Sequence, residues 1–100
     1  DEALFRVGSK GGRLVRVYAI YNEAAGTVAG ANFKLGSAAG GAQYVAATAY
    51  TDSAAIGDVT SATLVEDVIP ANGSVFLRHT GIATTAAGQV FVCVEYVENA

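Results

Sequence analysis

The sequence predicts an all-β fold, an antiparallel β-sandwich of jelly-roll-like form with about seven or eight strands. Apolar residues recur at a spacing of two, and breaks rich in Gly, Asn, Asp and Ser interrupt them about every eight to twelve residues. Helical spacing of apolar residues is hard to find, and residues 89–97 are mostly β-branched or aromatic. These observations are typical of a sandwich of short antiparallel strands.

The first strands are expected at residues 3–7 and 14–21, separated by a glycine-rich turn at 8–12. Alternation within 14–21 predicts two faces, one with Leu14, Arg16, Tyr18 and Ile20, the other with Val15, Val17, Ala19 and Tyr21. A loop is expected to follow at residues 22–26.

The next strand is expected at residues 28–35, where Ala31, Phe33 and Leu35 alternate with Asn32 and Lys34. We expect the apolar three to point inward. After a turn at 36–41, residues 43–50 are expected to form a strand, with an amphipathic helix as the alternative because of their alanines.

The second half begins with an expected surface loop at 51–63 and a short strand at 64–69, which Pro70 ends. Residues 70–73 form the clearest turn, because Pro70 presets φ and Asn72-Gly73 accepts positive φ. A strand at 75–80 follows, and residues 81–88 are expected to connect it as a hairpin to the closing strand at 89–97.

The closing strand is apolar on both faces, with Glu95 as the one interruption. A strand with one solvated face should alternate cleanly, so we expect both faces to be covered. In a chain of 100 residues, another subunit is expected to supply the second cover.

Length and composition predict one domain, with an N-terminal arm and short strand at 1–13 and a single β-sandwich at 14–100. Only 15% of the residues are charged, which suits a protein packed among other subunits. The net charge of −3 argues against nucleic-acid binding, and no apolar run reaches the roughly 18 residues of a membrane span. The chain begins without methionine, so we expect upstream residues to have been cleaved or left out.

Basic residues gather near the beginning of the chain. Four of the six lie in the first sixteen positions: Arg6, Lys10, Arg13 and Arg16. They are either solvated charges on the arm or a docking surface for an acidic partner, and they are the candidate partner-binding residues.

No cluster of residues indicates catalysis, a metal or a cofactor. His79 is the single histidine and Cys93 the single cysteine, too few for zinc and for an intrachain disulfide. Glu66 and Asp67 are neighbours, so on a strand they would face opposite sides and fail as a catalytic pair. Oxygen ligands on loops suit calcium, so the alternative to no metal is a calcium site at the carboxylates Asp52, Asp58, Glu66 and Asp67, although they match no EF-hand loop. The alternative for the tyrosines is a sugar-stacking platform, formed by Tyr18, Tyr21, Tyr44, Tyr50 and Tyr96. We expect no enzyme activity and no small-molecule substrate.

The order of the sequence segments in the second half resembles that of the small capsid decoration (head-stabilising or cement) proteins of tailed bacteriophages. A loop over residues 55–62 precedes a short strand, then come 69–75, a small-residue hairpin at 80–88 and the closing strand. In the first half, the segments at residues 14–21 and 33–36 share this resemblance, which covers about eighty residues in all.

The resemblance implies a sandwich or jelly roll on the outside of a virion shell, commonly a homotrimer, that bridges major capsid protein subunits without catalysis. The alternative is an extracellular filament assembled by donor-strand complementation, with residues 1–10 inserting Leu4 and Val7 into a neighbour. A third hypothesis is a secreted sugar-binding module that uses Tyr44 or Tyr50.

Overall fold

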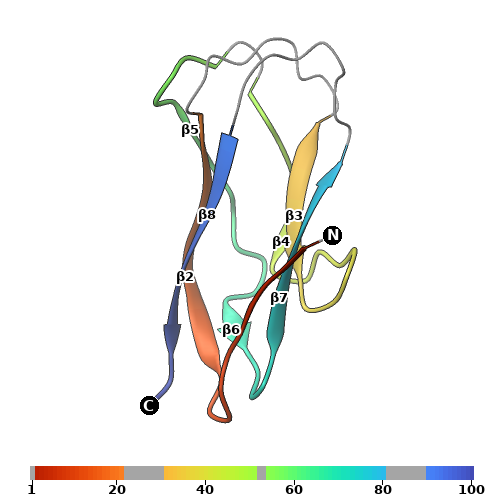
Figure 1. The fold of residues 1–100 in the computed structure, drawn as a ribbon, viewed down its shortest axis with the longest axis vertical. Helices are drawn as coiled ribbons and strands as arrows, with labels where there is room; N and C mark the ends of the chain where they lie inside the picture. The colour runs from red at the N-terminus through yellow and green to blue at the C-terminus, as the bar shows by residue number, and fades with distance from the viewer. Residues whose placement is uncertain (1, 22–30, 52–53, 81–89) are drawn as a thin grey trace.

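Two antiparallel sheets face each other along the long axis of the molecule (Figure 1). The computed structural model describes residues 2–21, 31–51, 54–80 and 90–100, and its extents are 43 × 24 × 18 Å. These residues form eight strands and no helix, so the all-β prediction is confirmed. In the described ranges, no helix is long and apolar enough to span a membrane.

The strands run in chain order as β1 (Glu2–Arg6), β2 (Gly12–Tyr21), β3 (Asn32–Gly36), β4 (Val45–Ala49), β5 (Val59–Ser61), β6 (Val68–Ile69), β7 (Ser74–Thr80) and β8 (Val90–Glu98). The first sheet has the order β1-β7-β3-β4. In the second sheet, β2 pairs with β5, β6 and β8. The arrangement is sandwich-like, and the finer jelly-roll order stays a prediction.

The core lies between the sheets and consists of side chains that alternate along the strands. Its fully buried members are Leu14, Val17, Phe33, Leu35, Val45, Ile69 and Val75. The predicted alternation in β3 is confirmed, because Phe33 and Leu35 are buried while Asn32 and Lys34 are only partly so. Residues 45–49 are a strand, as expected, and not the alternative helix.

A β-bulge divides β2 and overturns its predicted faces. The pairing with β8 shifts between Leu14 and Arg16, so Val15 is an extra residue in the ladder. Leu14 therefore shares the inner face with Val17, while Val15 is 55% exposed. Simple alternation predicts the wrong faces here, because the unpaired Val15 shifts every residue before it to the opposite face of the strand.

The predicted hairpin between the last two long strands is wrong, because they lie in different sheets. β7 pairs with β1 on one side and with β3 on the other. Both edges of β7 are therefore occupied, whereas β2 accepts β8 along its whole length.

The predicted surface loop at 51–63 contains a strand, since β5 pairs with Tyr18 to Ile20 of β2. The predicted strand at 64–69 is split: Leu64 forms an isolated bridge to Val45, and only β6 is a regular strand. Glu66 and Asp67 thus lie between these elements and not on a strand. The expected loop at 22–26, residues 28–30, the connection at 81–88 and Gln89 lie outside the described residues.

Two turns interlock at one end of the sandwich. The amide of Asn72 donates to the carbonyl of Gly8 (2.8 Å), and the amide of Val7 donates to the carbonyl of Gly73 (2.9 Å). Asn72 has φ 58°, as the predicted turn at 70–73 requires. Gly11 has φ 72°, and a Cβ there would lie 2.5 Å from the carbonyl oxygen of Ile69. The expected arm at 1–13 is thus integrated into the sandwich, with Val7 in its core.

We predict that Leu35→Ala lowers the free energy of unfolding by about 2–5 kcal/mol, because it opens a cavity between the sheets. Urea unfolding followed by circular dichroism measures the loss. Ile56→Ala is the matched control, since it removes the same number of carbon atoms from a side chain that is 71% exposed. The control should change stability by no more than about 0.5 kcal/mol. Equal losses in both variants would contradict the placement of the core.

Candidate interaction surface

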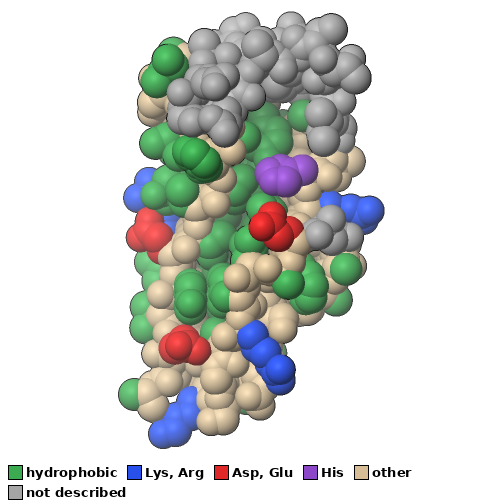
Figure 2. Space-filling view, viewed as in Figure 1, with side chains coloured by type: hydrophobic (Ala, Val, Ile, Leu, Met, Phe, Trp, Pro, Cys, Tyr) green, Lys and Arg blue, Asp and Glu red, His purple; other side chains and the backbone are tan. Residues whose placement is uncertain are grey.

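The outer face of the second sheet carries a row of apolar side chains, interrupted by Arg16 and Glu95, which we call the outer strip. Its members come from the outward positions of β2 and β8: Val15, Tyr18, Ile20, Phe91, Cys93 and Val97. The strand register places Ile20 opposite Phe91 and Tyr18 opposite Cys93. Val59 of β5 continues the row beside Ile20. Figure 2 shows hydrophobic side chains at several places along the left margin of the molecule, with basic and acidic side chains between them.

The outer strip is open to solvent in the described structure. Val15, Phe91 and Val97 are 55%, 52% and 56% exposed. On the opposite face of β8, Val90, Val92 and Val94 pack against the core. The sequence predicted cover on both faces of this strand; within the described residues only the inner face is covered. Large apolar side chains gathered on one face mark an interaction surface more often than singly scattered ones do.

The charges within the outer strip are matched. The Arg16 guanidinium lies 3.7 Å from the Glu95 carboxylate and 4.2 Å above the centre of the Tyr18 ring. Both members of the ion pair are about half exposed, so the pair contributes little to stability. The pair has a local effect. The charges of Arg16 and Glu95 would each be costly to bury against a partner, and the pairing largely neutralises them.

The Tyr18 hydroxyl stays protonated at neutral pH. Hydrogen bonding to the Cys93 side chain, followed by the charge of that group, raises the pKa of Tyr18 above its ordinary value. The centre of the strip therefore presents a neutral phenol beside the Cys93 sulfur.

The four basic residues singled out by the sequence do not form one patch. Arg16 pairs with Glu95 in the middle of the strip. Arg13 lies at the end of the strip, where its Nε is 4.0 Å from the Asp67 carboxylate. The Nε of Arg6 donates to the carbonyl of Asn72 (2.9 Å), and the carbonyl of Lys10 accepts from Asn99. Among the described residues, no carboxylate forms an ion pair with Arg6 or Lys10.

A hollow of about 300 Å³ lies where the outer strip meets Arg13. Arg13, Val15, Val97 and Asn99 line it, so apolar walls and a guanidinium share one small concave surface. Such a surface suits an apolar segment that carries a carboxylate, because the apolar part loses contact with water and the carboxylate would share Arg13 with Asp67, whose exposed contact with the guanidinium is weak. This feature was missed from the sequence, since Val15 enters the outer face only through the bulge.

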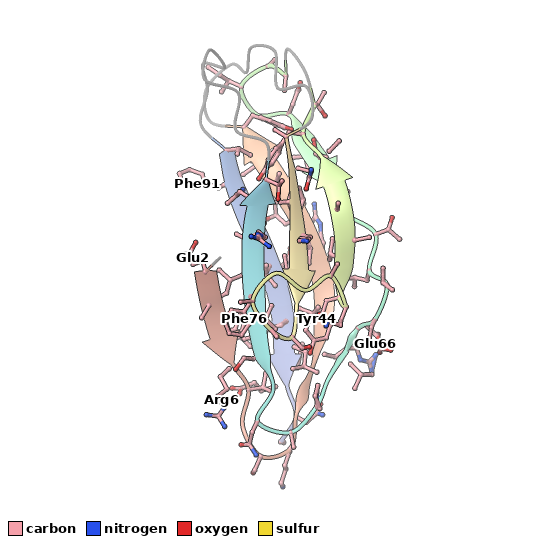
Figure 3. All side chains as sticks on the ribbon, turned by 90° about the vertical axis from the view of Figure 1, so that its right-hand side faces the viewer. Glu2, Arg6, Tyr44, Glu66, Phe76 and Phe91 are labelled. Carbon is pink, nitrogen blue, oxygen red and sulfur yellow. The ribbon has the colours of Figure 1, made fainter. Side chains whose placement is uncertain are left out.

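The tyrosines do not assemble a stacking platform. Tyr21 and Tyr44 are buried, Tyr96 stacks on Phe5 with ring centroids 3.8 Å apart, and Tyr18 lies on the outer face. Tyr44, labelled in Figure 3, is 2% exposed and belongs to the core cluster, so its ring cannot lie against a sugar. The Tyr50 hydroxyl bonds to Nδ1 of His79 (2.5 Å) instead of facing a ligand.

The carboxylates considered for calcium are dispersed. Asp58 accepts from the amide of Ala55, Glu66 accepts from the amide of Val68, and Asp67 pairs with Arg13. Asp52 lies outside the described residues. In the part of the chain that the structure describes, no three His, Cys, Asp or Glu side chains group as a metal site would require.

Comparisons with protein-family models, with curated proteins and with solved structures returned no match to this chain.

We predict that stability declines as pH rises above about 10, and that Tyr50→Phe makes this decline shallower. Burial first, and then the neighbouring Tyr21 hydroxyl, raise the pKa of Tyr50 well above its ordinary value. The folded chain therefore holds this proton more tightly than the unfolded chain, so its contribution is complete below the ordinary tyrosine pKa and is lost above it. Urea unfolding at a series of alkaline pH values measures the slope.

Tyr96→Phe is the control for this slope, because it removes a hydroxyl from a side chain that is 40% exposed. Some decline should remain in the Tyr50 variant, since burial also raises the pKa of Tyr44. An unchanged slope in Tyr50→Phe would show that its phenol titrates alike in both states.

Proposed function

We propose that this chain is a structural virion protein, a capsid decoration (cement) protein that binds the outside of a phage head shell and stabilises it. One observation carries the proposal: the outer strip ends in a hollow that combines the apolar side chains of Val15 and Val97 with Arg13. The sequence resemblance to decoration proteins of tailed phages supports the same role. Its partner is the major capsid protein, and its location is the virion exterior.

The shape of the surface suits attachment to another protein. The strip lies on a sheet and not on a loop, so its backbone is already ordered and binding requires no ordering of a loop. A shell repeats the same site many times, and an assembly that touches several subunits at once converts modest contacts into strong overall binding. The homotrimer that the resemblance implies rests on the resemblance alone.

The filament alternative is less favoured by the position of the N-terminal strand. Residues 2–6 pair with β7 of the same chain, Val7 is in the core, and Leu4 packs against it. A donor strand made of these residues would first have to leave its own sheet. The sugar-binding hypothesis is disfavoured because Tyr44 is buried.

We predict that Arg13→Glu weakens attachment to heads at least about tenfold while leaving the fold intact, because it reverses the charge of the hollow. The purified chain is added to heads that lack it, and the bound fraction is measured by sedimentation and gel densitometry. Added wild-type protein should saturate at a fixed ratio to the major capsid protein and should raise the temperature at which heads release DNA.

Lys34→Glu is the matched control, since it makes the same charge change on β3 of the other sheet. It should bind heads like the wild type. No binding of the wild type to such heads would contradict the proposed function, and equal binding of wild type and Arg13→Glu would contradict the role of the hollow.

A further inference from the structure

The outer edge of β8 is unusual among the sheet edges of this molecule. β8 has nine residues, and within the described chain it pairs with β2 alone. The other edge strands are short or irregular: β1 has five residues and a register shift, β4 has five residues, β5 has three and β6 has two. Short strands and bulges prevent pairing with other chains, and β8 has neither protection.

The side chains of β8 also do not prevent pairing of its free edge with another strand. The strand contains no lysine and no proline, which are the usual residues that block an open edge. Its two carboxylates already have partners, because Glu95 pairs with Arg16 and Glu98 accepts from the amide of Gly8. From Val90 to Val94 the strand is wholly uncharged.

We propose that two copies of this chain join edge to edge through β8, antiparallel and centred on Val94, so that their second sheets become one continuous sheet. In this register Val94 lies opposite itself, Cys93 lies opposite Glu95, and the terminal Val90 lies opposite Glu98. Phe91 lies opposite Val97 of the second copy on the outer face, and Val92 lies opposite Tyr96 on the inner face. Aromatic and β-branched pairs of this kind stabilise antiparallel strands. Two-fold symmetry forms each pair twice.

The nearest alternative register is poorer. Centring the pair on Cys93 places Phe91 opposite Glu95, an apolar ring against a carboxylate, and shortens the overlap to residues 90–96. Centring it on Val94 uses all nine residues of the strand. The two Glu95 side chains then lie diagonal to each other, each beside its own Arg16.

The neighbouring edge of the first sheet has complementary charges. β1 lies on the same side of the sandwich as β8, since the Phe5 ring of β1 stacks on the Tyr96 ring of β8. Figure 3 shows Glu2 and Arg6 at opposite ends of β1. The same two-fold axis reverses β1, so the two copies of β1 run antiparallel to each other near the axis.

Edge pairing leaves the outer strips free for a further partner. The two-fold axis is perpendicular to the second sheet, so both outer faces point in the same direction. The pair therefore presents two copies of the hollow at Arg13 on one broad surface.

Engineered disulfides test the register directly. In a Cys93→Ser background, Phe91→Cys with Val97→Cys should give a covalent dimer after oxidation by diamide, seen on a non-reducing gel. Six residues of extended strand span about 20 Å, so these cysteines cannot bridge within one chain. Phe91→Cys alone and Val97→Cys alone are the matched controls and should stay single chains, because neither lies opposite itself. Cross-linking of the single variants to the same extent would overturn the register.

The solution mass tests the assembly without new cysteines. Light scattering over a range of concentrations should give twice the chain mass of 10.1 kDa. Phe91→Lys with Val97→Lys should weaken the dimer at least about tenfold, because each lysine then faces another. Val15→Lys, a similarly exposed site one strand away from the edge, should leave the mass unchanged.

A monomer at the highest soluble concentration, a trimer, or a dimer that survives both lysines would each overturn the proposal. Circular dichroism of the variants checks that the sheets remain folded. A dimer that does not bind heads would support this inference and contradict the proposed function, so the two outcomes are separable.

Discussion

Strand β2 is the element on which the second sheet depends. β5, β6 and β8 all pair with it, and within the described residues they pair with no other strand of that sheet. A buried backbone amide that loses its partner costs about 1–3 kcal/mol, so separating β2 from this sheet would expose three sets of unpaired groups at once. The same strand supplies core side chains on its inner face and the outer strip on the other. Its bulge at Val15 decides which residue serves which face.

Local sequence signals predicted the strands well and their partners poorly. The alternation in β3 and the β-branched run of β8 predict strands from residues that are adjacent in the sequence. The Pro-Ala-Asn-Gly turn is likewise predicted from four consecutive residues. Pairing is different, because β7 is flanked in space by β1 and β3, which are distant in sequence. The short β5 gave no periodic signal, since three residues are too few to show one.

The interaction surface was only partly accessible to sequence reasoning. The apolar outer side of β8 and the cluster of early basic residues were both recognised. What the sequence could not show was that Arg16 would be matched by Glu95 and Arg13 by Asp67, because each pair joins segments far apart in the chain. The hollow beside Val15 depends on one inserted residue in a ladder, which leaves no compositional trace.

Each sheet pairs one of the first two strands with a strand from the second half of the sequence. Glu2 pairs with Leu77 in one sheet, and Gly12 pairs with Glu98 in the other. During synthesis, the first two strands therefore emerge from the ribosome long before their partners. Closing such long loops is slow, and unpaired strands are prone to aggregate while they wait. We expect this domain to fold only after β8 has been made, in one late step that requires both halves of the sequence.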